Sequence, residues 1–377
     1  MSLETYFHQF LDDYQGLSDY QIEGTNLREW NYEDGCLYLG LQRLYEATGD
    51  KAYKDYIIKH VSPYVEGDGV INTYRLKEYS LDFINAGRAF YFLYDQTGEV
   101  RYRKAIDSLM RQLEYQPCLT TGNYWHKLIY PFQVWLDGLY MAQPFCMEYE
   151  NRFNGRKRYF EILHQFDEVR RILYDEKMGL YYHAYDEYKE RTWADPETGL
   201  SPNFWLRSIG WFLMALTDCY ELASEEIYEV KARYGELLRE AVHGILPYQD
   251  KESRMFYQLP ALPNHEGNYT ETSGNLMVAY ALLKGSRIGA LLKEKYIKKG
   301  KEIYESVIKE KLIEKEDAKW HLVDTCASAG LGPHKERDGS IEYYLSEKRA
   351  DDDPKAVGML MMTTAEVIRI EGGGKHG

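Results

Sequence analysis

The sequence predicts an all-α protein in which six helical hairpins close into a ring, an (α/α)6 barrel. Two observations favour this fold: an internal repeat of helical hairpins, and long loops rich in tryptophan, glycine and proline between the hairpins. The two clear copies of the repeat are offset by 49 residues. The first comprises Leu44-Tyr45, Thr48-Gly49, Tyr53 and Ile57, and the second comprises Leu93-Tyr94, Thr97-Gly98, Tyr102 and Ile106.

Each copy predicts a helix, a Thr-Gly turn and a second helix, because glycine commonly ends a helix at its C-terminal cap. A looser third copy consists of Tyr149, Asn154-Gly155 and Tyr159. Helical periodicity continues through residues 211–234, 274–292 and 293–311. Six hairpins of roughly 50–60 residues would account for the whole chain.

The loops decide between two arrangements of these hairpins. An open solenoid needs only short turns, whereas segments 117–132, 193–203 and 259–271 are long. Long ordered loops usually build binding sites, which favours the closed ring. No linker or strand-rich region is evident, so we predict one domain over residues 1–370, followed by a disordered glycine-rich tail at 371–377.

Composition excludes several classes of function. The 377 residues carry a net charge of −14, which disfavours a protein that binds nucleic-acid phosphates. No apolar run reaches the ~18 residues of a membrane span, and residues 1–17 show no signal peptide. The five cysteines form no Cys-x-x-Cys motif, which indicates a reducing compartment, so we expect a cytoplasmic protein. Composition does not predict the oligomeric state.

The most informative segment is 130–141, which reads as a loop that leads into a helix. Asp137 lies at the start of that helix, between Trp135 and Gly138. A carboxyl group beside an aromatic wall can become an acid catalyst, because a less polar environment raises its pKa. The alternative interpretation is that Asp137 only complements the helix dipole.

A second acid, Asp82, is expected at the entry to the second helix of the hairpin that precedes Asp137. In a ring of hairpins, equivalent helix ends point to the same face, so the two carboxyl groups could meet across a pocket. Two neighbouring carboxylates separate their pKa values, which would leave one protonated near neutral pH. The alternative for Asp82 is a capping role.

Cationic and aromatic side chains accompany these acids. We predict that Ser201-Pro202 opens a helix with Trp205, Arg207 and Trp211 near its start. An arginine between tryptophans suits a carboxylate ligand, because its planar fork binds in a bidentate way and stacks. The alternative is a surface cation–π pair. Further candidates are His126, Lys127 and His183, of which His183 could equally be a structural histidine.

Motifs for metal or nucleotide chemistry are missing from the sequence. There is no His-Glu-x-x-His motif, cysteine cluster or carboxylate triad, so we expect no catalytic metal. There is also no P-loop, dinucleotide-binding Gly-x-Gly-x-x-Gly or Gly-x-Ser-x-Gly elbow. We therefore expect no cofactor.

A set of short segments in a fixed order resembles a known family, the unsaturated rhamnogalacturonyl hydrolases of glycoside hydrolase family 105, which are related to the unsaturated glucuronyl hydrolases of family 88. The set runs through nearly the whole chain. It comprises Trp125-His126-Lys127 and residues 130–145, 182–186, 201–211, 267–273, 329–332, 337–340 and 353–358.

The resemblance implies an (α/α)6 barrel whose substrate, a small anionic oligosaccharide, ends in a 4,5-unsaturated uronic acid. It further implies that Asp137 is the general acid/base and Asp82 the assisting acid. The residues that would line the sugar site are Trp30, Trp135, His126, Lys127, His183, Trp205, Arg207 and Trp211, with Arg207 or His183 on the substrate carboxylate. Two segments depart from the family pattern. Leu206 is expected to narrow the site, and Asp352-Asp353-Pro354 to alter a loop.

The implied reaction begins by protonation of C4 of the enol ether, after which water adds at C5 and the resulting hemiketal opens. Two enzymatic alternatives remain on the same fold: a sugar epimerase that uses His126 and His183 as a pair, and an inverting hydrolase. The non-enzymatic alternative is a helical-repeat interaction module. Sequence does not identify the sugar attached to the uronic acid.

Overall fold

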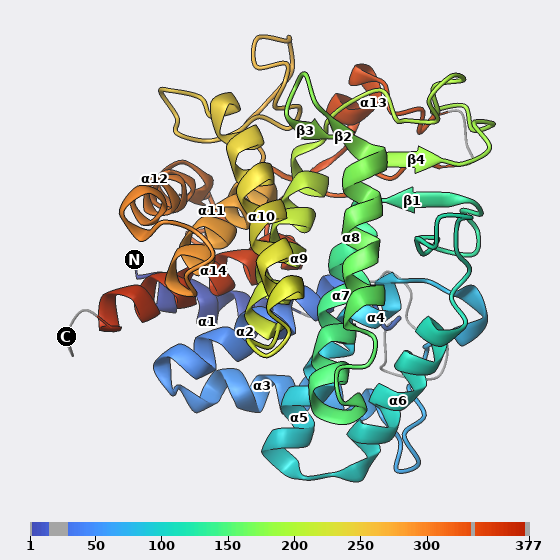
Figure 1. Cartoon of the computed structure of the whole chain (residues 1–377). Coiled ribbons are helices and arrows are strands. Elements are labelled where there is room, and N and C mark those ends of the chain that lie inside the picture. The colour runs from blue at the N-terminus through green and yellow to red at the C-terminus, as the bar shows by residue number, and fades with distance from the viewer. Residues whose placement is uncertain (1, 15–28, 333–335, 374–377) are drawn as a thin grey trace.

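The computed structural model describes residues 2–14, 29–332 and 336–373. Across these residues, six inner helical segments contact one another in a closed ring (Figure 1). In ring order they are α2 (Tyr32–Thr48), α4 (Asp82–Ala86) continued by α5 (Arg88–Thr97), α7 (Asp137–Tyr149), α9 (Leu206–Leu222), α11 (Thr272–Arg287) and α14 (Pro354–Gly373), which returns to α2. The predicted (α/α)6 barrel is confirmed.

Outer helices pack against the inner helices next to them in sequence. They are α3 (Lys51–Val61), α6 (Val100–Glu114), α8 (Tyr159–Leu173), α10 (Tyr228–Ile245) and α12 (Lys293–Lys311). Helix α1 (Leu3–Asp13) lies beside the ends of α2 and α14, where Phe7, Leu44 and Ile368 line a common groove. The first and last helices of the chain thus meet where the ring closes.

The repeated Thr-Gly turns end α2 and α5 as predicted. Gly49 and Gly98 adopt φ angles of 76° and 70°, the left-handed region that glycine adopts without strain. Thr48 and Thr97 donate hydroxyl hydrogen bonds to carbonyls one turn back, at 2.7 and 2.8 Å. The looser third copy ends similarly, because a π-helical turn, η3 (Glu150–Asn154), leads to Gly155 at φ 65°.

Helix boundaries in the second half differ from the expected ranges. The segment 211–234 belongs to two helices, α9 and α10, and the segment 274–292 ends early, at Arg287. Within the described ranges there are three short 3-10 helices, η1 (Ser62–Tyr64), η2 (Leu76–Glu78) and η4 (Leu246–Tyr248). Helix α14 continues to Gly373, three residues into the expected tail, and residues 374–377 lie outside the described residues, as do parts of the N-terminal segment 1–17.

Short antiparallel strand pairs shape the long loops. They are β1 (Gln133–Trp135) with β4 (Ala184–Asp186), β2 (Tyr174–Asp175) with β3 (Leu180–Tyr181), β5 (Leu312–Glu314) with β6 (Trp320–Leu322), and β7 (Thr325–Cys326) with β8 (Arg349–Ala350). A last short helix, α13 (Ile341–Ser346), lies near β2, β3 and β4 in Figure 1. In the part of the chain that the structure describes, no helix is both long and apolar enough to cross a bilayer. All five cysteines are free, and only Cys118 is exposed.

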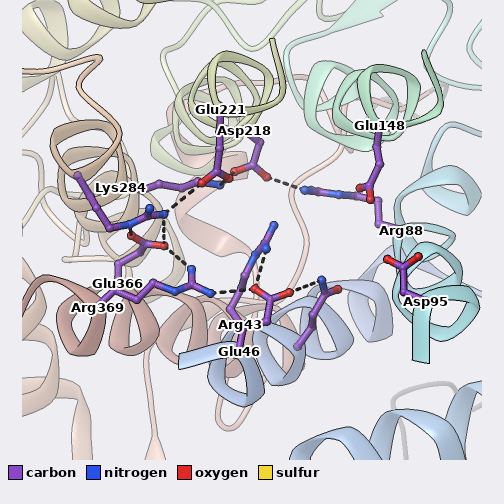
Figure 2. A network of polar contacts seen from close by, with 12 residues as sticks. Arg43, Glu46, Arg88, Asp95, Glu148, Asp218, Glu221, Lys284, Glu366 and Arg369 are labelled. Carbon is purple, nitrogen blue, oxygen red and sulfur yellow. Dashed lines mark hydrogen bonds and ion pairs between the residues drawn. The ribbon is translucent and has the colours of Figure 1, made fainter. Parts of the chain in front are cut away.

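A network of ion pairs joins the C-terminal halves of the inner helices (Figure 2). At its centre, Asp218 on α9 accepts from Arg88 on α5 at 2.7 Å and from Lys284 on α11 at 2.6 Å. Further pairs link Lys284 with Glu221, Arg287 with Glu366, and Arg369 with Glu46. Because all inner helices run in the same direction, their N-terminal ends meet at the opposite end of the ring.

Candidate active site

A pocket of about 250 Å³ opens among the N-terminal ends of the inner helices. Eight of the ten predicted site residues line it, and both acids are among them. They are Asp82, His126, Lys127, Trp135, Asp137, Trp205, Arg207 and Trp211. The expectation that equivalent helix ends bring Asp82 and Asp137 to one pocket therefore agrees with the geometry.

Asp137 is the first residue of α7, directly after strand β1. The β1–β4 pairing sets Trp135 opposite Ala184, and the amide of Leu136 donates to the His183 carbonyl at 2.9 Å. This register brings His183 Nε2 to 3.2 Å from Asp137 Oδ2. The contact is close but not aligned as a hydrogen bond.

His183 lies behind Asp137 and does not line the pocket. Its ring is fully buried, and its Nδ1 atom is 2.7 Å from the hydroxyl of Tyr344 on α13. The prediction that His183 holds a substrate carboxylate therefore does not fit this position. Any influence of His183 on a ligand would pass through Asp137.

Asp82 is the first residue of α4 and is held ionised by two neighbours. Lys127 Nζ lies 2.5 Å from Oδ2, and His126 Nε2 lies 3.2 Å from Oδ1. Burial alone would raise the pKa of Asp82, but Lys127 and His126 outweigh it and hold the pKa well below its usual range. Asp82 is thus ionised and paired within the protein, so it does not share a proton with Asp137.

Aromatic rings form the wall beside these acids. Trp135 stacks between His126, at a centroid distance of 4.9 Å, and Tyr130, at 4.7 Å. Gln133 accepts from its indole nitrogen at 3.0 Å. Gly138, next to Asp137, lets α7 approach closely, because a Cβ there would lie 3.1 Å from Leu81 and 3.3 Å from His126.

Arg207 is a buried wall residue rather than a surface cation–π pair. Its guanidinium stacks on Trp205 at 4.7 Å from the ring centroid, and it donates to the Cys326 carbonyl. Glu271 lies 3.8 Å away. Arg207 is therefore rigidly held, and part of its donor capacity is already used.

Three sequence-based expectations about this region are wrong. Trp30 does not line the pocket; it is buried in the core, stacks on Phe90 at 4.9 Å and donates to the Phe83 carbonyl. Leu206 does not narrow the site, because it is buried against Gly274. Ser201-Pro202 does not open the helix, since α9 begins at Leu206 with Trp205 as its N-cap.

The segment 352–354, which differs from the family pattern, links parts of the fold that are distant in sequence. Asp352 Oδ1 accepts from the Tyr6 hydroxyl at 2.7 Å and from the Leu322 amide at 2.9 Å. Asp353 contacts Lys355, whose ammonium also reaches Glu33 on the pocket wall at 2.5 Å.

Sequence reasoning missed half of the pocket wall. The additional residues are Tyr32, Glu33, Tyr130, Met141, Ser328, Ala329, Gly330 and Arg337. Helical spacing could have indicated Met141, which lies one turn after Asp137. The logic of equivalent helix ends could have indicated Tyr32, at the start of α2. Arg337 begins one of the segments that carry the family resemblance, but no role was assigned to it; it lines the pocket without an ion pair to any described carboxylate.

One group of side chains among the described residues is close enough to hold a metal ion. Glu4, His8 and Asp50 have ligand atoms within 4.8 Å of one another. None of the three lines the pocket that holds Asp137.

The chain matches known proteins along nearly its whole length. The family model for Glycosyl Hydrolase Family 88 matches residues 6–371. The solved structure of a family 105 glycoside hydrolase from C. acetobutylicum ATCC 824 is 38% identical and covers 96% of this chain and 99% of its own, with a TM-score of 0.88.

Two curated relatives match smaller parts. Protein Atu3128 of Agrobacterium fabrum is 35% identical over 234 residues, 60% of this chain and 98% of the relative. The unsaturated rhamnogalacturonyl hydrolase YesR of Bacillus subtilis is 26% identical over 277 residues, 72% of this chain and 74% of the relative. The family resemblance predicted from short segments is confirmed, and the chain belongs to Glycosyl Hydrolase Family 88 and is a glycoside hydrolase.

Proposed function

We propose that this glycoside hydrolase removes a 4,5-unsaturated uronic acid from the non-reducing end of oligosaccharides that polysaccharide lyases release. Unsaturated rhamnogalacturonan disaccharides are the preferred substrates. The observation that carries the proposal is the position of Asp137 on the wall of a small pocket that also holds cationic and aromatic side chains.

The pocket suits one anionic sugar ring. Its volume, about 250 Å³, is below the range of pockets for drug-sized ligands. Inner-helix N-termini, whose dipoles favour anions, surround it. Lys127, Arg207 and Arg337 add positive charge locally, so an anionic ligand is compatible with a protein of net charge −14.

Asp137 takes two roles in the proposed reaction. It first protonates C4 of the enol ether, which creates an oxocarbenium-like centre at C5. It then accepts a proton from the water that adds at C5. The hemiketal so formed opens and releases the partner sugar. Asp82, ionised between Lys127 and His126, assists by stabilising positive charge.

The substrate carboxylate needs a cation that faces the pocket. Arg207 stays a candidate because it lines the wall, although Cys326 and Glu271 already engage it. Arg337 is the stronger candidate, because it has no ion pair with any described carboxylate. The burial of His183 behind Asp137 argues against it as the group that holds the carboxylate.

The enzymatic alternatives fit less well. An epimerase would present two histidines to its sugar, but His183 lies behind Asp137 and His126 contacts Asp82 and Trp135. An inverting hydrolase would use Asp82 and Asp137 as a conventional pair at the anomeric carbon.

Isotope labelling tests the reaction directly. Lyase-generated substrate should lose its enol ultraviolet absorbance on incubation with the enzyme. In D₂O, one deuterium should appear at C4 of the released keto sugar, and in H₂¹⁸O the label should enter at C5. A thioglycoside should also be cleaved. Label at the anomeric carbon would contradict the proposal and favour direct glycosidic attack.

The partner sugar is tested with a panel of lyase products. The similarity to YesR, named an unsaturated rhamnogalacturonyl hydrolase, supports products of rhamnogalacturonan. We expect the highest kcat/KM on these, compared with products of ulvan and glycosaminoglycans. A higher kcat/KM on another class would keep the reaction and change the substrate.

A further inference from the structure

A buried chain of polar atoms runs from α13 to the candidate acid. The Tyr344 hydroxyl lies 2.7 Å from His183 Nδ1, and His183 Nε2 lies 3.2 Å from Asp137 Oδ2. Tyr344 and His183 are both fully buried, whereas 13% of the Asp137 side chain stays exposed. The chain thus connects an enclosed hydroxyl with a carboxyl group that reaches the pocket.

Neighbouring side chains hold the outer end of this chain in place. Gln258 accepts from the Trp205 indole at 3.0 Å and donates to the Tyr344 carbonyl at 3.4 Å. The ring of Trp205 in turn packs on His183 at a centroid distance of 4.8 Å. The imidazole therefore has little freedom to turn away from Asp137.

The hydroxyl of Tyr344 can select one tautomer of His183. Burial raises the pKa of Tyr344 well above its usual value, so the group stays a neutral hydroxyl. Among the described residues, its one hydrogen-bond partner is His183 Nδ1. If the hydroxyl donates there, the proton of the neutral imidazole lies on Nε2, facing Asp137.

That tautomer has a consequence for the two oxygens of Asp137. Oδ2 is buried against His183 and would accept from Nε2–H, a role that the carbonyl oxygen of a carboxylic acid fills better than the protonated oxygen. The proton would then lie on Oδ1, the oxygen left toward the pocket. Such contacts are often poorly aligned in free enzymes and tighten when substrate binds.

We propose that Tyr344 is a positioning residue that fixes the Nε2–H tautomer of His183, which in turn keeps the transferable proton of Asp137 on its pocket-facing oxygen. This inference rests on the proposed role of Asp137 as general acid/base. Other titratable and charged groups that share the pocket are Asp82, His126, Lys127, Arg207, Glu33 and Arg337.

The first test is Tyr344→Phe, which removes the hydroxyl and keeps the ring. We expect kcat to fall at least ~10-fold with KM unchanged, as for other lost outer partners of a functional histidine. Without a fixed donor on Oδ2, the carboxyl group gives up its proton less readily. The alkaline limb of kcat/KM should therefore move to higher pH. Tyr304→Phe is the matched control, because it removes a buried hydroxyl that bonds Thr364 at 2.9 Å, between α12 and α14.

A fall in kcat with an unmoved alkaline limb would assign Tyr344 a merely structural role and overturn the inference, as would unchanged kinetics. The second test needs no variant at position 344. Nitrogen-15 NMR of histidine-labelled wild-type protein, with the His183 signals assigned through His183→Gln, should show a protonated Nε2 and an unprotonated Nδ1. The opposite tautomer, or a doubly protonated ring, would overturn the inference. Because this readout uses no substrate, it stands even if the proposed reaction fails.

Discussion

Lys127 Nζ lies 2.5 Å from Asp82 Oδ2, on a carboxylate whose other oxygen faces His126 at 3.2 Å. Asp82 is therefore paired within the protein before any substrate arrives. The sequence predicted that Asp82 and Asp137 would share a proton. In the structure each acid has its own partners: Lys127 and His126 for Asp82, and His183 for Asp137.

Lys127→Met should change the pH dependence of activity. Lys127 depresses the pKa of Asp82, so the ionised form persists to low pH and is lost only as the pH falls through that depressed value. Without the cation the pKa rises, and the acid limb of kcat/KM should move to higher pH. The control is Lys298→Met, at an exposed lysine on α12. An acid limb that stays in place would show that Asp82 ionisation does not govern activity.

Asp137→Asn should abolish most turnover while the protein stays folded. The amide keeps the shape of the side chain but can neither donate the proton to C4 nor accept one from water, so kcat should fall at least ~10²–10⁴-fold. Loss of enol absorbance measures the rate, and thermal unfolding checks the fold. Near-wild-type turnover in a folded variant would remove Asp137 from the mechanism.

The ring and its two acids were predictable because their signals are local. A Thr-Gly turn ends a helix through its own backbone. An acid at the start of an inner helix lies at the same end of the ring as the starts of the other inner helices. The residues that sequence reasoning misplaced depend on distant packing. Trp30 was predicted to line the pocket, but it lies in the core, where its indole nitrogen donates to the Phe83 carbonyl.

Tyr344 and Arg337 were missed for the same reason. Arg337 lies in the loop before α13 and Tyr344 on α13 itself, 200 and 207 residues after Asp137, and each reaches the site only because the last part of the chain closes the ring. His183 was recognised but assigned to the substrate, since periodicity does not reveal on which side of Asp137 the residue between β3 and β4 lies.

Arg207 and Arg337 make separable contributions to substrate binding. Arg207→Lys should lower both affinity and rate, because an ammonium cannot stack on Trp205 and reach Cys326 while facing the pocket. Arg337→Ala should mainly raise KM. Arg337 forms no ion pair with a described carboxylate of the protein, so it can bind the substrate carboxylate without breaking one.

Steady-state kinetics on one unsaturated disaccharide, with the two variants side by side, check this division. An Arg337→Ala variant with unchanged KM, together with a raised KM in Arg207→Lys, would return the carboxylate to Arg207. Full activity of Arg207→Lys would instead show that the bidentate fork is dispensable.

Lys284→Met should lower the stability of the protein by weakening the ion-pair network between the inner helices, without changing a residue of the pocket. Lys284 and Asp218 are each about 1% exposed, and Glu221 shares the same ammonium at 2.8 Å. Removing the cation leaves Asp218 paired only with Arg88 and Glu221 only with Arg287, and the loss of one partner of a buried ion pair costs up to about 3–5 kcal/mol. Denaturant unfolding should show this loss, whereas Lys298→Met, at an exposed pair, should change stability by less than about 1 kcal/mol.

The pH dependence of the same variants gives an independent check. Burial opposes ionisation of Glu221, but Lys284 and Arg43 outweigh it and lower the pKa to about 2. A lowered pKa in the folded state stabilises the protein above the unfolded value near 4.5, and this contribution is lost as the pH falls toward 2. In Lys284→Met, Asp218 and Glu221 have one cation fewer and protonate more easily, so the stability gap to wild type should narrow between pH 4.5 and 2. A gap that stays constant over this range would mean that the network contributes packing rather than charge.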